Sequence, residues 1–206
     1  MKNKKNESQH SPFIDDFTLA QRAHQGDERA LRQLADQVLD RVRSTAYCLA
    51  GGDHEFEDYA QQALIEILKS SGTFRGDSSI ESWANQITVR TVIRHLKQRR
   101  SRARVVELRS ELPSAYELTL SAEDSVTQNR VSRRITRLLS ELKPKYRVVL
   151  TLKNILGHSI EEIVSLTDTN PHTIDYRLRR GREQLRKKIK RDPMLTEWMA
   201  SWGGKP

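Results

Sequence analysis

The sequence has little of what disulfide-stabilised, zinc-binding or β-rich proteins need. Its 206 residues include one cysteine, Cys48, which excludes an internal disulfide, and no group of Cys and His has the spacing of a zinc site. Aromatic residues make up 6% of the chain and apolar residues 36%. A core must therefore be built from aliphatic residues on amphipathic elements, and this composition argues against an all-β sandwich.

Long apolar runs are also missing. No stretch reaches the ~18–20 consecutive apolar residues that cross a bilayer. Residues 1–12 are polar and lysine-rich and lack the apolar stretch of a signal peptide. We expect a disordered N-terminus over 1–12, no membrane insertion and a cytoplasmic protein.

Positive charge, by contrast, is concentrated in two stretches. The net charge is +9, and residues 90–104 hold seven basic side chains and no acid, while residues 177–191 hold nine basic side chains and one acid. The rest of the chain has 20 basic and 26 acidic residues. Two basic patches on an otherwise acidic chain favour binding of one long polyanion at two places, because phosphate neutralisation supplies most sequence-independent affinity. The alternative is a pair of solvated helix faces.

Helix signals dominate the first half of the chain. Asp27 follows a glycine and predicts an N-cap, while Thr18 and Ser78 each have Gln or Glu three residues later and predict capping boxes. Strongly amphipathic periodicity lies between these starts. We expect a four-helix unit over residues 13–104.

A composition change separates this unit from a second one. Residues 105–130 combine proline, Ser, Thr and acidic residues and predict an acidic linker. Helical periodicity returns over residues 131–192, where a capping box at Ser159 and an Asn-Pro pair beginning at Asn170 predict two successive helices. The expected fold class is all-α, with two small helical domains joined by a linker.

The tail over residues 193–206 has an amphipathic pattern of its own. Its apolar residues recur at helical spacing and share one face: Met194, Leu195, Trp198, Met199 and Trp202. We expect this face to fold back onto the second domain and enlarge its core. The alternative is a docking face, since Trp and Met are enriched at interfaces.

The second unit ends in the pattern of a helix-turn-helix, a short helix followed by a four-residue turn and a basic helix. In this motif the second helix presents its outward side chains to base edges in the major groove. The outward positions are His172, Asp175, Tyr176, Arg179 and Arg180. Arg179 is expected to reach a base, while Arg177, Arg180 and Arg182 contact phosphates.

A loop over residues 74–79 precedes the first basic patch. Its aromatic ring, small polar groups and glycine suit capture of an unstacked base of single-stranded DNA, where stacking contributes ~1–3 kcal/mol per base. Phe74 would supply the ring. The equally weighted alternative places Phe74 in the core of a turn, and Trp83 is expected in the core.

These motifs together resemble the extracytoplasmic-function (ECF) sigma factors of bacterial RNA polymerase, which have only a minus-ten domain and a minus-thirty-five domain. Residues 57–62 resemble the acidic motif with which the family binds core polymerase, although Gln62 replaces the usual Glu. Residues 74–89 resemble the region that melts and reads the minus-ten element. Residues 157–182 align without a gap with the minus-thirty-five reader, and the resemblance extends over residues 17–191.

The resemblance implies a role for each set of residues. The first domain would be sigma region 2, with core polymerase bound through Asp58, Gln61 and Gln62, and the second would be sigma region 4. The implied minus-ten contacts are Phe74, Arg75, Ser78, Ser79, Arg90, Arg94, Lys97, Arg99 and Arg100. The implied minus-thirty-five contacts are His172, Thr173, Asp175, Tyr176, Arg177, Arg179, Arg180 and Arg182. Asp175 and Tyr176 depart from the family's usual residues, so no promoter sequence is implied.

The implied partners are core RNA polymerase, promoter DNA and an anti-sigma factor, with no cofactor, no metal and no enzymatic activity. A second hypothesis is a stand-alone helix-turn-helix regulator that binds an operator without polymerase. A third is a nucleic-acid enzyme, which would need clustered carboxylates for a metal or an activated nucleophile. The one tight acidic cluster, residues 53–58, lies at a predicted helix start, where acids favour the helix dipole.

Overall fold

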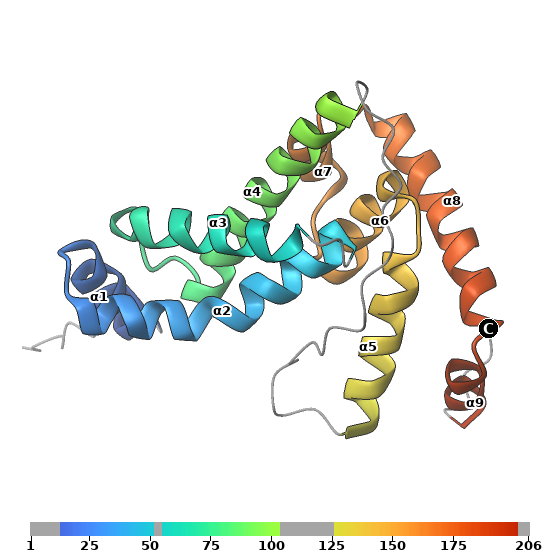
Figure 1. The fold of residues 1–206 in the computed structure, drawn as a ribbon, viewed down its shortest axis with the longest axis horizontal. Coiled ribbons are helices and arrows are strands. Elements are labelled where there is room, and N and C mark those ends of the chain that lie inside the picture. The colour runs from blue at the N-terminus through green and yellow to red at the C-terminus, as the bar shows by residue number, and fades with distance from the viewer. Residues whose placement is uncertain (1–12, 52–54, 104–125, 202–206) are drawn as a thin grey trace, which may run out of the picture.

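The computed structural model describes residues 13–51, 55–103 and 126–201, and every regular element in these ranges is helical (Figure 1). The first half contains α1 (Ile14–His24), α2 (Glu28–Ala50), α3 (Phe56–Lys69), the 3-10 turn η1 (Ser71–Thr73) and α4 (Ile80–Ala103). The second half contains α5 (Val126–Ser140), α6 (Pro144–Leu150), the π-helical turn η2 (Thr151–Ile155), α7 (Ile160–Thr167), α8 (Pro171–Ile189) and α9 (Pro193–Ser201). The predicted all-α class with two helical domains is confirmed.

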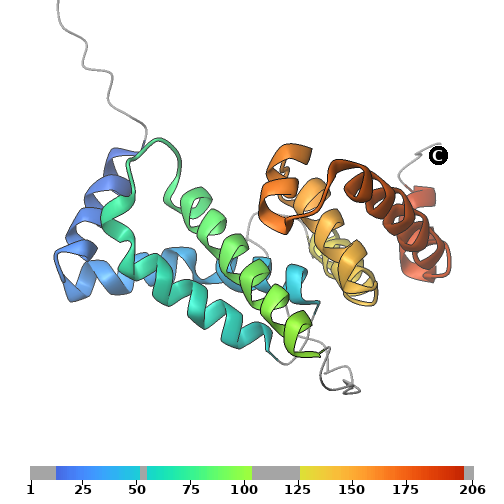
Figure 2. The same cartoon turned by 90° about the horizontal axis from the view of Figure 1, so that it is seen from above.

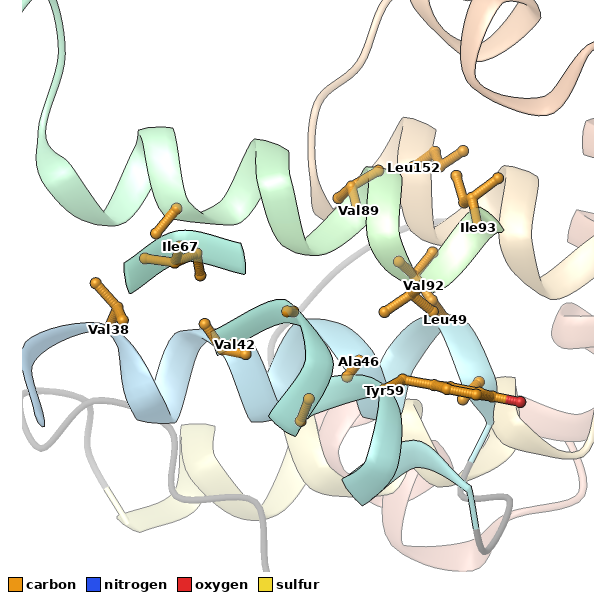
Figure 3. Packing of buried hydrophobic residues seen from close by; sticks show 14 of the residues in the cluster. Val38, Val42, Ala46, Leu49, Tyr59, Ile67, Val89, Val92, Ile93 and Leu152 are labelled. Carbon is orange, nitrogen blue, oxygen red and sulfur yellow. The ribbon is translucent and has the colours of Figure 1, made fainter. Parts of the chain in front are cut away.

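The first domain is organised around α2. One face of this helix is completely buried at Leu34, Val38, Val42 and Ala46, whose regular spacing of four follows the helical period. Helices α3 and α4 pack against this face, and Figure 3 shows Ile67 and Val92 from these two helices in the same cluster. The aliphatic pattern of the sequence thus builds the expected four-helix unit.

Two of the predicted helix starts in this domain are wrong. Helix α1 begins at Ile14, and the Thr18 hydroxyl donates back to the Ile14 carbonyl at 2.9 Å, so Thr18 is an interior residue. Helix α4 begins at Ile80 with Ser79 as its cap, because the Ser82 N–H donates to the Ser79 hydroxyl. The Asp27 cap is confirmed by hydrogen bonds from the N–H groups of Arg29 and Ala30.

The start of the second domain differs from the prediction, and its later helices agree with it. Helix α5 begins at Val126, inside the segment predicted as linker, while residues 104–125 lie outside the described residues. The capping box of Ser159 and Glu162 is confirmed, with both reciprocal hydrogen bonds present. Asn170 caps α8 by accepting from the Thr173 N–H at 2.8 Å, with Pro171 as the first helical residue.

The two domains lie side by side and share a continuous core (Figure 2). Helices α5 and α6 contact α2, and α7 contacts α4. Figure 3 shows Leu152 of the second domain next to Val89 and Ile93 of α4. The described chain is therefore one packed body rather than two separated domains.

The tail folds back onto the second domain, as expected, but Met199, which was assigned to its packing face, is exposed. Leu195 in α9 is 1% exposed and packs with Val131 and Leu138 of α5. Asp192 fastens the start of α9 by accepting from the Leu195 N–H and the Arg134 side chain. Burial alone would raise the pKa of Asp192, but these hydrogen bonds outweigh it and hold the pKa below the ordinary value. Trp202, also assigned to this face, lies outside the described residues.

The first prediction concerns this tail. Leu195→Ala removes a fully buried side chain and should destabilise the chain by ~2–5 kcal/mol, whereas Met199→Ala, on the exposed side of α9, should change stability by less than about 0.5 kcal/mol. Thermal unfolding followed by circular dichroism measures both. Equal melting temperatures for wild type and Leu195→Ala would show that α9 does not belong to the core.

Candidate nucleic-acid and polymerase interfaces

The first basic stretch occupies the C-terminal half of α4, where some of its cations already have carboxylate partners. Arg94 forms an ion pair with Glu66, and Arg99 lies 3.6 Å from a carboxylate oxygen of Glu55. Arg90 and Lys97 are exposed. The side chain of Arg100 lies outside the described residues. Phosphates approaching α4 would compete with Glu66 and Glu55 for two of the predicted contacts.

A groove of about 480 Å³ lies between α3 and α4. Trp83 and Ile87 supply apolar lining, and Lys69, Arg90 and Arg94 supply positive charge. An apolar surface edged by cations is the combination that accepts an unstacked base together with its phosphate. Sequence reasoning placed Trp83 in the core, and its half-buried side chain does pack against the core, but the part that Trp83, Ile87 and Lys69 play in lining a groove was not predicted. The signal was helical spacing: Ile87 lies four residues after Trp83 and Arg90 three residues after Ile87, which puts all three on one face of α4.

In the loop before α4, Phe74 agrees with the core interpretation and not with the base-stacking one. The Phe74 ring is 2% exposed and packs against Trp83, with ring centroids 5.4 Å apart. In this structure Phe74 is a core residue that supports Trp83, and its ring does not face solvent. Arg75 is exposed, and Ser78 and Ser79 are half-buried, with Ser79 serving as the cap of α4.

The implied polymerase contacts lie on the outer face of α3. Asp58, Gln61 and Gln62 are all exposed and follow the spacing of three and four that places them side by side. Tyr59 and Ala60, between them in sequence, point into the core. Ile65 is 42% exposed one turn further along, so this polar face continues into an apolar one. Sequence reasoning did not select Ile65.

The predicted helix-turn-helix is formed by α7 and α8. Ile163 of α7 packs in the same cluster as Ile174 and Leu178 of α8, and Asp168 in the turn has a left-handed backbone (φ 55°). All five positions predicted to face outward are exposed: His172, Asp175, Tyr176, Arg179 and Arg180. Thr173 is half-buried near the cap. The geometry leaves the N-terminal half of α8 open to a DNA groove.

The cations along α8 are held in different ways. Arg180 and Lys187 flank Glu183 at 2.7 and 3.0 Å, and hydrogen bonds from these two cations lower the pKa of the Glu183 carboxyl. Arg177 turns toward the α7–α8 turn and donates to the Thr169 hydroxyl at 3.3 Å. Arg179 and Arg182 are exposed. The predicted base contact, Arg179, therefore extends into solvent from α8.

The described residues contain neither a metal-ligand cluster nor a helix that could span a membrane. Within residues 13–51, 55–103 and 126–201, no group of three or more His, Cys, Asp or Glu side chains is placed to hold a metal ion. None of the helices in these ranges is long and apolar enough to span a bilayer.

Comparison with known proteins agrees with this division into two domains. The family model for sigma-70 region 2 matches residues 34–102, and the model for sigma-70, region 4 matches residues 132–185. These matches place α4 and its groove in region 2 and the helix-turn-helix in region 4. Similarity to individual proteins identifies the type of sigma factor.

The chain is 28% identical over 174 residues to the ECF RNA polymerase sigma factor SigW of Bacillus subtilis, covering 80% of this chain and 91% of SigW. It is 30% identical over 168 residues to the ECF sigma factor SigE of Mycolicibacterium smegmatis, covering 78% of this chain and 63% of SigE. The sigma factor RpoE of Bartonella quintana, solved with the anti-sigma factor NepR, has a similar fold with a TM-score of 0.51 at 21% identity, covering 78% of this chain and 97% of RpoE. The chain belongs to the ECF sigma factor family.

The second prediction tests the placement of Phe74. Phe74→Ala should lower the stability of the chain by ~3–5 kcal/mol, because it removes a buried aromatic ring. Arg75→Ala, at the exposed neighbouring position, should leave stability nearly unchanged. Chemical denaturation of the two variants separates these outcomes. A Phe74→Ala variant as stable as wild type would return the ring to the solvent-facing interpretation.

Proposed function

We propose that this chain is a dissociable RNA polymerase subunit that directs core polymerase to specific promoters, assists DNA melting and performs no catalysis itself. The observation that carries this proposal is the pair of basic DNA-binding surfaces, one in a region 2 domain and one in a region 4 domain. Proteins similar to this chain are named as ECF RNA polymerase sigma factors. The chain would act where polymerase acts, in the cytoplasm.

Core polymerase binding is assigned to the outer face of α3. Asp58, Gln61 and Gln62 are exposed on a rigid helix whose opposite face is buried, so they can dock without rearranging the domain. Ile65 extends this face with apolar area, and an apolar centre beside polar groups is common in protein interfaces.

Minus-ten recognition is assigned to the groove between α3 and α4. An unstacked base would lie against Trp83 and Ile87, and Arg90 would hold its phosphate or its edge. Phe74 acts as a positioning residue, because it packs behind Trp83. Arg75, Ser78 and Ser79, in the loop before α4, would contact the same strand, and the other predicted cations of α4 would follow its backbone: Arg94, Lys97, Arg99 and Arg100.

Minus-thirty-five recognition is assigned to α8. Asp175, Tyr176 and Arg179 would contact base edges, and His172 and Thr173 lie at the helix N-terminus, where phosphates are favoured. Arg177, Arg180 and Arg182 would contact the backbone. Because Asp accepts hydrogen bonds and Arg donates them, Asp175 and Arg179 would select bases of different kinds.

Regulation by a separate anti-sigma factor is also part of the proposal. The similarly folded RpoE is described in complex with the anti-sigma factor NepR. A stand-alone regulator, the second hypothesis from the sequence, would have no use for the groove between α3 and α4 or for the exposed polar face of α3. It would bind its operator without polymerase.

The third prediction tests the assignment to polymerase. The purified chain should form a complex with core RNA polymerase and produce run-off transcripts from a library of promoters. Asp58→Lys should weaken that complex about tenfold or more, because it reverses a charge in the proposed interface. Asp15→Lys, the same charge reversal at an exposed position of α1, serves as the matched control.

Competition for core polymerase measured by fluorescence anisotropy gives both affinities. A chain that binds specific duplexes but never associates with core polymerase would establish the stand-alone regulator instead.

The fourth prediction separates base reading from phosphate contact on α8. Arg179→Ala should lose ~1–3 kcal/mol of discrimination at one or two bases of the minus-thirty-five element. Arg182→Ala should weaken all promoters alike and reduce the salt dependence of binding. Holoenzyme binding to promoters with single-base changes, measured at several salt concentrations, distinguishes the two patterns. Identical losses across all promoters from both variants would contradict these roles.

A further inference from the structure

A carboxylate of α1 caps the start of α4. The first N–H groups of a helix have no partner within that helix. The first of α4, that of Ile80, donates to a carboxylate oxygen of Asp16 at 2.9 Å, across 64 residues of sequence. The positive end of the helix dipole also favours a carboxylate at this place. Asp16 is therefore a second cap of α4, supplied by another helix, beside the local cap Ser79.

The other oxygen of Asp16 connects this contact to α2. It accepts from the Gln37 side chain at 3.2 Å, and the same Gln37 nitrogen donates to Glu81 of α4 at 3.2 Å. Asp16 is half-buried, so its hydrogen bonds compete less with water than those of an exposed carboxylate. Three helices of the first domain thus meet at one side chain.

The loop over residues 74–79, here called the minus-ten loop, also rests on α1 in its middle. Gly76 is buried and has φ +74°. A Cβ at this position would lie 3.5 Å from the Phe17 Cβ atom and 3.9 Å from the Phe13 carbonyl oxygen. The backbone of the loop therefore passes directly beside the first turns of α1 (Figure 2).

The minus-ten loop is consequently held at three places. The ring of Phe74 fixes its start against Trp83, Gly76 packs on α1 in its middle, and Asp16 binds the residue that follows its end. The proposed DNA contacts of the loop lie between these places: Arg75, Ser78 and Ser79. Two of the three attachments come from α1.

We propose that α1 is a clamp for the minus-ten loop, with Asp16 as a positioning residue that fixes the loop in the form that captures unstacked bases. This inference rests on the proposed function and deepens its melting step. The match to sigma-70 region 2 begins at residue 34, so the clamp lies outside the matched residues. A loop that is already held loses less conformational freedom when it binds, and more of its binding energy remains to separate the strands.

Two promoter templates that differ only in pairing test the clamp. One is fully paired, and the other has mismatches that leave its minus-ten element unpaired. Asp16→Ala should reduce run-off transcription from the paired template about tenfold, because loss of a charged cap loosens the loop. On the unpaired template it should stay within about twofold of wild type, since no energy is needed there to separate the strands. Transcription by core polymerase alone is subtracted from each.

Two further variants separate the hydrogen bond from the charge. Asp16→Asn keeps an oxygen that can accept from the Ile80 N–H, and it should lose no more than about threefold on the paired template. Asp15→Ala removes the same charge at the neighbouring exposed position and should transcribe like wild type on both templates.

The outcomes distinguish the clamp from the proposed function. Equal losses by Asp16→Ala on both templates would overturn the clamp, because a general loss of folded protein or of polymerase binding does not depend on pairing. Wild-type activity of Asp16→Ala on the paired template would overturn it as well. Absence of transcription by the wild type from both templates would instead overturn the proposed function.

Hydrogen exchange measures the attachment of α4 directly. Asp16→Ala should accelerate exchange of the Ile80 amide about tenfold or more, while the amide of Val92, in the buried middle of α4, should exchange at the wild-type rate. An unchanged Ile80 rate in this variant would contradict the clamp.

Circular dichroism checks that each variant is folded. If Asp16→Ala does not fold, the comparison of templates with Phe17→Ala decides, since this change removes the contact with Gly76 and leaves Asp16 in place. A loss confined to the paired template would support the clamp, and any other result would overturn it.

Discussion

The guanidinium of Arg147 is the interaction on which the arrangement of the two domains depends. Hydrogen bonds from a charged donor each contribute ~1.5–3 kcal/mol, and a buried charge left without them would cost several kcal/mol. Arg147 meets this requirement by donating to carbonyls at the ends of two helices from different domains. Moving the domains apart would expose both the cation and the last carbonyls of α2. The rest of the interface is aliphatic, and aliphatic contacts have little directional preference. The hydrogen bonds of Arg147 therefore fix the orientation of one domain relative to the other.

Acidic side chains form ion pairs with arginines on both proposed DNA-binding surfaces. Glu66 and Glu55 hold Arg94 and Arg99 of α4, and Glu183 holds Arg180 of α8. Such exposed ion pairs are weak and are screened by salt, so a phosphate can replace the carboxylate at little cost. The pairs of Arg94 and Arg99 connect α4 to α3 and its N-terminal end, whereas the pair of Arg180 lies along α8. DNA phosphates can therefore bind these arginines, but they must first displace the carboxylates.

The sequence predicted what depends on neighbours along the chain and missed what depends on distant ones. Caps at Asp27, Ser159 and Asn170 are local hydrogen bonds and were predicted correctly. Phe74 could not be placed, because an aromatic residue in a loop satisfies either a core or a stacking role until its neighbour Trp83 is known. Arg147 was not selected at all, since its partner Leu49 is 98 residues away and no periodicity connects them. Thr18 shows the opposite error: its sequence matches a capping box, but the residue lies in the interior of a helix.

Helix α8 approaches α6 closely because residue 181 has no side chain. A Cβ at Gly181 would lie 2.9 Å from the Leu150 Cδ1 atom and 3.3 Å from the Tyr146 Cβ atom, so a larger residue would require Leu150 to change its side-chain conformation or α8 to shift away from α6. The direction in which α8 points its outward side chains is consequently set by a position that touches no base. Promoter preference in this chain could evolve through the angle of the helix, with every DNA-contacting residue unchanged. Replacement of Gly181 would change the orientation of α8 and leave its outward side chains unchanged.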